Sequence, residues 1–112
     1  MRIAIPTAAG KLAMHFGHCE EFVLIDVDTE KKEILKTEAV VAPAHQPGLL
    51  PPWLAEQGTG MIIAGGMGSR AQNLFRQQNI SVLVGAPALE PEAIAKAFLD
   101  GSLAAGDNVC DH

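Results

Sequence analysis

Histidine and cysteine side chains gather in three short segments of the sequence. One segment reads His15-Phe16-Gly17-His18-Cys19, one is a proline-rich stretch with a single histidine, and the third ends the chain as Cys-Asp-His. Imidazole and thiolate are the ligands that soft and borderline transition metals prefer. Each side chain alone is better explained as a surface or packed residue, but their joint occurrence in predicted loops favours a metal site. The candidate ligands are His15, His18, Cys19, His45, Cys110 and His112.

A second constellation is the glycine-rich stretch that follows a short apolar run and precedes a predicted helix. Such a turn places backbone amides and a helix N-terminus at the carboxyl end of a strand, where open α/β sheets bind ligands. It lacks the Gly-Lys-Ser/Thr of a Walker loop and the further glycine of a dinucleotide fingerprint. A purely structural tight turn is the alternative. The candidate anion-binding residues are Gly65, Gly66, Met67, Gly68, Ser69 and Arg70.

Residues for acid-base or nucleophilic catalysis are poorly represented. The carboxylates of Glu20, Glu21, Asp26 and Asp28 fall at predicted strand-start or hairpin positions, where solvent surrounds them. A catalytic cysteine needs a lowered thiol pKa, and no base is placed against Cys19 by the sequence. We therefore expect a binding protein and not an enzyme.

The composition narrows the partners further. The chain has 112 residues, a formal net charge of −5 and no cluster of basic residues, which argues against nucleic acid as a partner. Its apolar runs are far shorter than the ~20 residues of a membrane span. A strand-like start in place of a signal peptide, together with two widely separated cysteines, indicates a reducing cytoplasm and no structural disulfide.

The first half of the chain predicts three neighbouring antiparallel strands. A strand around Ile3 and Ile5 is expected to stop at Pro6, with residues 7–11 forming a turn. A second strand spans residues 22–28, and a polar hairpin connects it to a third over residues 34–41.

The second half predicts alternating helices and buried strands. A helix over residues 51–57 ends at Gly58, and strands at residues 61–64 and 81–84 flank a second helix that ends at Asn79. Ser69 and Gln72 form a capping-box pattern for that second helix. Strand-helix-strand with short links predicts a parallel crossover.

The apolar stripes and the boundaries of the domain follow from the same segments. We expect the second helix to bury Ala71, Leu74 and Phe75, and a last helix from Glu90-Pro91 to Gly101 to bury Ile94, Ala97 and Phe98. Residues 1–101 are therefore predicted to form one α/β domain, with residues 102–112 as a mobile tail.

The succession of these segments resembles a known family. It comprises residues 1–6, His15-Phe16-Gly17, a strand ending at residues 25–27, Trp53-Leu54-Ala55-Glu56-Gln57-Gly58, and residues 63–71. In this combination, and over nearly the whole chain, the sequence resembles the dinitrogenase iron-molybdenum cofactor biosynthesis family. That family includes NifX, NafY, the carboxy-terminal domain of NifB and the small orange proteins of sulfate reducers.

The resemblance carries expectations about fold and function. It implies a ribonuclease-H-like α/β fold with a five-stranded mixed sheet, three strands antiparallel and two parallel, and about three flanking helices. It also implies a carrier that receives a metal-sulfur cluster from one protein and passes it to another. The cluster would be iron-sulfur, an iron-molybdenum cofactor precursor or a molybdenum-copper sulfide. By motif, His15, His45, residues 65–70 and the Cys110-Asp111-His112 ending correspond to family features.

Two other functions remain open at this point. A small regulatory or interaction module would bind a phosphorylated metabolite or a carboxylate at the glycine-rich turn, without using the histidines or cysteines. A metal-dependent hydrolase would follow from ribonuclease-H-like topology alone, and it ranks last because the sequence lacks the convergent carboxylates of two-metal chemistry.

Overall fold

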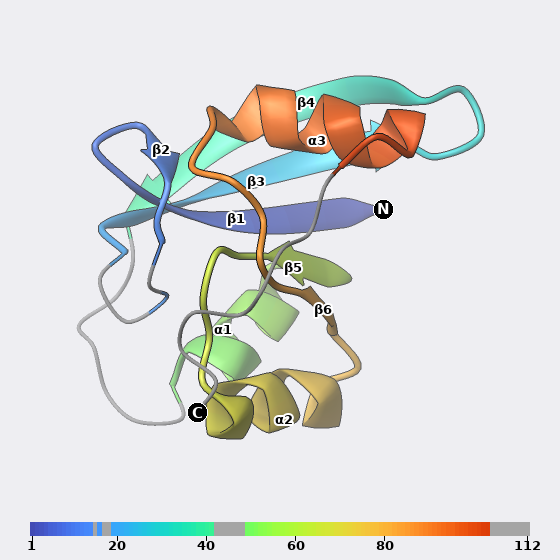
Figure 1. Cartoon of the computed structure of the whole chain (residues 1–112). Helices are drawn as coiled ribbons and strands as arrows, with labels where there is room; N and C mark the ends of the chain where they lie inside the picture. The colour runs from blue at the N-terminus through green and yellow to red at the C-terminus, as the bar shows by residue number, and fades with distance from the viewer. Residues whose placement is uncertain (15, 17–18, 42–48, 104–112) are drawn as a thin grey trace.

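A mixed β-sheet forms the centre of the molecule in a computed structural model that describes residues 1–14, 16, 19–41 and 49–103 (Figure 1). In these residues the sheet has six strands in the order β4-β3-β1-β5-β6, with β2 paired to β1. The strands are β1 (Arg2–Ala8), β2 (Lys11–Leu12), β3 (Glu21–Asp28), β4 (Glu33–Val41), β5 (Met61–Ile63) and β6 (Ser81–Leu83).

Strand pairing confirms the predicted division of the sheet. β1, β3 and β4 are antiparallel neighbours, whereas β5 is parallel to both β1 and β6. The mixed α/β class is therefore confirmed, while the prediction of five strands missed the short strand β2. The ribonuclease-H-like classification stays a prediction.

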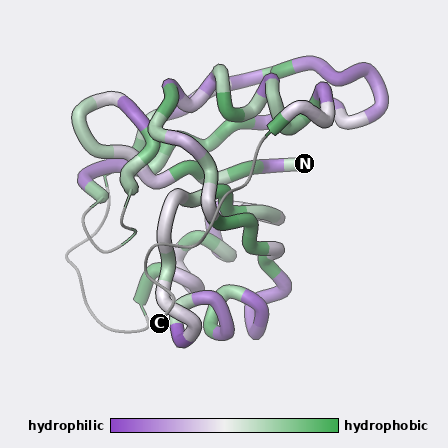
Figure 2. The backbone as a smooth tube through the Cα atoms, viewed as in Figure 1, coloured by the Kyte–Doolittle hydropathy of each residue, from purple (hydrophilic) through white to green (hydrophobic). Residues whose placement is uncertain are grey.

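Helices cover both faces of the sheet. α1 (Leu50–Glu56) and α2 (Ser69–Gln77) lie on one face, and α3 (Pro91–Asp100) lies on the other (Figure 1). Because successive strand residues point to opposite faces, Ile3 and Ile5 pack in the core beside α3, whereas Ala4 packs in the core beside α1 and α2. Figure 2 shows hydrophobic residues along the central strands and hydrophilic ones in the β3–β4 turn and on the outer side of α2.

Strand β1 continues beyond Pro6, contrary to the prediction that it stops there. Pro6 pairs with Phe22 of β3, and its carbonyl accepts the N–H of Ala13 at 2.9 Å. The backbone nitrogen of a strand residue points to the same side as its carbonyl, here the side of β5. The ladder with β5 already ends at Ala4, so the missing N–H of Pro6 breaks no ladder bond there.

The hairpin from β1 to β2 depends on a two-residue turn. Ala9 and Gly10 both have positive φ, 55° and 80°, which two-residue turns of type I′ require. An alanine seldom adopts this conformation, so the residue types gave little sign of the hairpin. The turn directs the chain from β2 towards the carboxyl end of β5.

Helix boundaries agree with prediction within one or two residues, but two details of the helices were wrong. α2 begins at Ser69 with Gly68 as N-cap and no side-chain cap, so the capping box is absent; Gln72 instead donates to the carbonyl of Met67 at 2.9 Å. α3 buries Ile94, Ala95 and Leu99, whereas Ala97 and Phe98 are only partly buried. α2 likewise buries Phe75 but leaves Ala71 and Leu74 only partly buried.

Candidate functional site

Three connecting segments meet at the carboxyl ends of the parallel strands. Beyond β5 and β6, the N–H of Gly85 donates to the carbonyl of Gly65 at 2.6 Å, and the N–H of Ala86 donates to the carbonyl of Ala64 at 3.2 Å. The third segment comes from β2, where the N–H of Leu12 donates to the carbonyl of Leu89 at 2.9 Å. This is the edge at which open α/β sheets bind ligands.

Gly65 allows the segment after β2 to approach the turn. A Cβ atom at Gly65 would lie 3.0 Å from the Cα and the carbonyl oxygen of Met14 and 3.1 Å from the carbonyl oxygen of Ala13. These neighbours are backbone atoms, which cannot rotate away as a side chain can. Gly65 is therefore required for a close crossing of two backbones.

Phe16 fixes the same segment to the turn and to the core. Its N–H donates to the carbonyl of Gly66 at 2.9 Å. Its ring is buried, edge-on to Phe75 of α2 with centroids 5.5 Å apart and tilted against Phe22 of β3 at 6.1 Å. A role for the motif around Phe16 was predicted from the sequence, but the fact that Phe16 fixes the segment to the core was not. The signal that could have indicated it is an aromatic residue between the histidines of a predicted loop.

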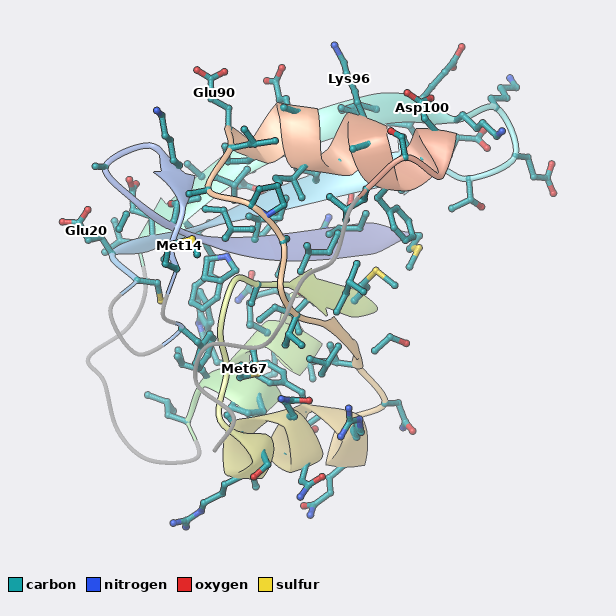
Figure 3. All side chains as sticks on the ribbon, viewed as in Figure 1. Met14, Glu20, Met67, Glu90, Lys96 and Asp100 are labelled. Atoms are coloured by element: carbon teal, nitrogen blue, oxygen red, sulfur yellow. The ribbon has the colours of Figure 1, made fainter. Side chains whose placement is uncertain are left out.

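The inner half of the glycine-rich turn has a structural role. Gly65 and Gly66 are buried, and both carbonyls accept backbone hydrogen bonds from neighbouring segments. Met67 is 1% exposed and lies between the sheet and α2 (Figure 3). A ligand in solvent has no access to the Met67 side chain, so among the predicted anion-binding residues Met67 serves packing.

The outer half of the turn is accessible and carries the free donors. Gln72 makes the first bond of α2, to the carbonyl of Gly68 at 3.1 Å, so the amides of Ser69, Arg70 and Ala71 have no acceptor within the helix. Ser69 and Arg70 are exposed, and a Cβ at Gly68 would meet no atom within 4 Å. These amides and the helix dipole favour an anion at this position.

Arg70 adds a side-chain charge at the same end of α2. It makes no hydrogen bond or ion pair with the described part of the chain, whereas Arg2 binds Asp26 and Arg76 contacts Gln72 and Asn73. Arg70 is thus available to a ligand, and Arg76, at the far end of the same nine-residue helix, is a natural comparison.

Cys19 is the one predicted metal ligand whose position the structure describes. Its thiol is free and half-buried against the core beside α1 and α2, and its N–H donates to the carbonyl of Phe16 at 3.3 Å. Burial raises the pKa of the Cys19 thiol, so the protonated form predominates at neutral pH.

The other predicted ligands, His15, His18, His45, Cys110 and His112, lie outside the described residues. Among the residues that are described, no group of three or more histidine, cysteine or acidic side chains could hold a metal ion. Within the same residues, no helix is long and apolar enough to cross a membrane.

Comparison with known proteins places the chain in a family. Residues 1–101 match the family described as dinitrogenase iron-molybdenum cofactor. The chain belongs to this family. A similar protein is the uncharacterized protein MJ0580 of Methanocaldococcus jannaschii. It is 30% identical to this chain over 106 residues, which cover 92% of this chain and 89% of that protein.

Solved structures extend the likeness to the whole fold. The crystal structure of PH0822 has a TM-score of 0.85 at 30% identity and covers 94% of each chain. The apo form of the orange protein from Desulfovibrio gigas has a TM-score of 0.73 at 25% identity, covering 96% of this chain and 93% of the orange protein. Membership of the dinitrogenase cofactor family thus rests on sequence and fold together.

Proposed function

We propose that this chain is a cytoplasmic carrier of an anionic metal-sulfur cluster, which it binds without catalysing a reaction. The cluster is held between the N-terminus of α2, residues 68–70, and the loops that contain His15 and His45. Its class is iron-sulfur, an iron-molybdenum cofactor precursor or a molybdenum-copper sulfide. The partners are the proteins that donate and accept the cluster.

One observation carries the proposal: both sequence neighbours of His15 contact the glycine-rich turn. Met14 lies against Gly65, and Phe16 donates its N–H to Gly66. A candidate thiolate or imidazole ligand and a set of free amides therefore belong to segments that meet at one edge of the sheet. Family membership and the likeness to the orange protein support the same interpretation.

Electrostatics explains why such a cargo suits this edge of an acidic protein. The chain carries a net charge of −5, which would repel an anion from most of its surface. The amides of Ser69, Arg70 and Ala71 and the Arg70 guanidinium provide donors and positive charge at one place. Sulfide-rich clusters are anions with sulfur acceptors, so these groups hold them in addition to direct ligands.

Reconstitution tests the proposal. The protein is incubated anaerobically with tetrathiomolybdate and copper, or with an iron-sulfur cluster donor, then desalted and analysed for metal and for charge-transfer absorption. The proposal predicts a coloured protein with a fixed metal-to-protein ratio, reduced in His15→Ala. Protein that remains colourless and free of metal after both treatments would overturn it.

The free amides of α2 also suit a phosphate or carboxylate, which keeps the regulatory module as a second candidate. Under that alternative, Arg70→Ala weakens binding of a phosphorylated metabolite, whereas His15→Ala and Cys110→Ala leave it unchanged. Cluster binding predicts that His15→Ala lowers cluster retention, so the two functions give different results with the same variants.

A further inference from the structure

Strand β4 forms an outer edge of the sheet and leaves one side of its backbone without a partner strand in the described chain. It stands at one end of the strand order and, among the described strands, pairs only with β3. Residues 35–39 of this nine-residue strand are all exposed, and Leu35 and Val41 are 63% and 75% exposed. A long exposed edge with apolar side chains is a template for another strand.

The charges of β4 favour one register of pairing with a second copy over the two registers next to it. Two copies would pair as antiparallel strands related by a two-fold axis normal to the sheet. Residues opposite each other in such a pair point to the same face, so the allowed registers differ by a slide of one strand past the other by two residues. Centring the pair on Thr37 places Lys36 of each copy opposite Glu38 of the other. A shift of two residues either way places Lys36 opposite Lys36 or Glu38 opposite Glu38. Opposed unlike charges stabilise a ladder and like charges destabilise it.

The same register extends a row of charges that already crosses the sheet. Arg2 of β1 pairs with Asp26 of β3, and Asp26 pairs with Lys36 of β4. Arg2 Nε lies 2.8 Å from Asp26 Oδ1. In the dimer, Glu38 of the second copy would lie next to Lys36. Charges of alternating sign would then run from Arg2 in β1 through β3 and β4 to the second copy.

Apolar residues and the bulge of β4 are compatible with this arrangement. The register shift in the β3–β4 ladder leaves Leu35 between the paired residues Ile34 and Lys36. In the register centred on Thr37, Leu35 lies opposite Ala39 of the other copy. Beyond the bulge the regular alternation ends, because Ile34 packs on the α3 face of the sheet and Val40 on the opposite face. The bulge limits the regular ladder to Lys36–Glu38 and its nearest neighbours, and the pair of threonines at the centre is a favourable cross-strand contact.

We propose that β4 pairs antiparallel with β4 of a second copy of this chain, centred on Thr37, joining two sheets into one. The glycine-rich turn follows β5, and β3 and β1 separate β5 from β4 in the strand order, so pairing leaves the glycine-rich turn of each copy open. The dimer is independent of the proposed cluster cargo.

Sedimentation equilibrium over a wide range of concentration tests the dimer. Wild-type protein is expected to show reversible dimerisation, and Lys36→Glu or Glu38→Lys to weaken it by roughly tenfold or more, because each change makes two opposed pairs repulsive. The control Lys96→Glu has the same charge change on exposed α3, where Figure 3 shows Lys96 pointing away from the sheet. It is expected to dimerise as the wild type does.

Mixing the two β4 variants separates edge pairing from a fault in folding. Lys36→Glu and Glu38→Lys are each expected to be folded monomers by circular dichroism. When mixed, they place unlike charges opposite each other at both positions, and a heterodimer is expected. The double variant restores unlike pairs and should self-associate again. A monomeric wild type at millimolar concentration, a dimer indifferent to both reversals, or no association on mixing would each overturn the proposal.

Discussion

The main-chain N–H of Phe16 donates a hydrogen bond to the carbonyl oxygen of Gly66 over 2.9 Å, which joins the histidine-containing segment to the glycine-rich turn. The Phe16 ring reinforces this bond, because it is buried between Phe22 and Phe75. The backbone bond sets the position of the segment, and the ring resists its withdrawal. The proposed site depends on both.

Phe16→Ala is expected to lower the free energy of unfolding by about 3–5 kcal/mol, because it empties a buried aromatic position. Phe16→Leu keeps most of the apolar volume and should cost less than half as much. Urea unfolding followed by tryptophan fluorescence of Trp53 measures both. A Phe16→Ala protein within about 1 kcal/mol of the wild type would show that the ring is not an anchor.

Gly65→Ala is expected to destabilise the protein by about 1–3 kcal/mol, the range for overpacking, because its Cβ would press on the backbone of Met14. Gly68→Ser is the control, since a Cβ there meets nothing within 4 Å, its φ of −63° suits any residue, and serine is a favourable N-cap for α2. Thermal unfolding of both variants gives the comparison. Equal melting temperatures for the two would contradict the close crossing at Gly65.

Asp26→Asn is expected to show a pH-dependent cost. The hydrogen bond from Arg2 is the main reason that the pKa of Asp26 lies below its usual value. Such a carboxyl contributes stability above its unfolded-state pKa of about 3.9 and loses the contribution as the pH falls through the folded value. Because the pair is partly exposed, we expect a cost of about 1 kcal/mol at pH 7.

Chemical unfolding of wild type and Asp26→Asn at intervals from pH 7 to pH 2 checks this. The difference between the two proteins should hold down to about pH 5 and shrink below pH 4, where Asp26 begins to take up its proton. A difference that stays constant to pH 2 would mean that the Arg2–Asp26 pair is not its source.

Much of this architecture could be predicted from the sequence, because the deciding signals were local. The hairpin after Asp28, the Gly58 and Gly101 helix ends, and the parallel pair around α2 all follow from turn residues and apolar runs. The Asp28 carboxylate accepts the N–H groups of Glu30 and Lys31, as expected of an aspartate in a turn.

What could not be predicted depends on contacts between distant segments. Pro6 is tolerated in β1 because the parallel ladder has already ended, which no local pattern reveals. The capping box at Ser69 was wrong because the extended Gly68, placed by the preceding turn, serves as N-cap. The role of Gly65 and Gly66 in ligand binding stays a prediction. What the sequence did not indicate is the close crossing of Gly65 with the backbone of Met14, or the hydrogen bond from Phe16 to the carbonyl of Gly66.

Cys19 is expected to react slowly with iodoacetamide at pH 7.5, because burial raises the pKa of its thiol and the thiolate is the nucleophile. A Cys110→Ser background isolates this thiol. The rate should still be rising with pH at pH 9, and bound cluster should suppress alkylation if Cys19 is a ligand. A rate at pH 7.5 equal to that of an unstructured cysteine peptide would contradict the raised pKa.

The most direct measurement is the affinity of tetrathiomolybdate for wild type, Arg70→Ala and Arg76→Ala, determined by optical titration under anaerobic conditions. Both variants lose one positive charge from α2, but only Arg70 lies at its N-terminus beside the free amides. Cluster binding at this edge predicts roughly tenfold weaker binding in Arg70→Ala and near-wild-type affinity in Arg76→Ala. Equal losses in the two variants, or no loss in Arg70→Ala, would contradict the account.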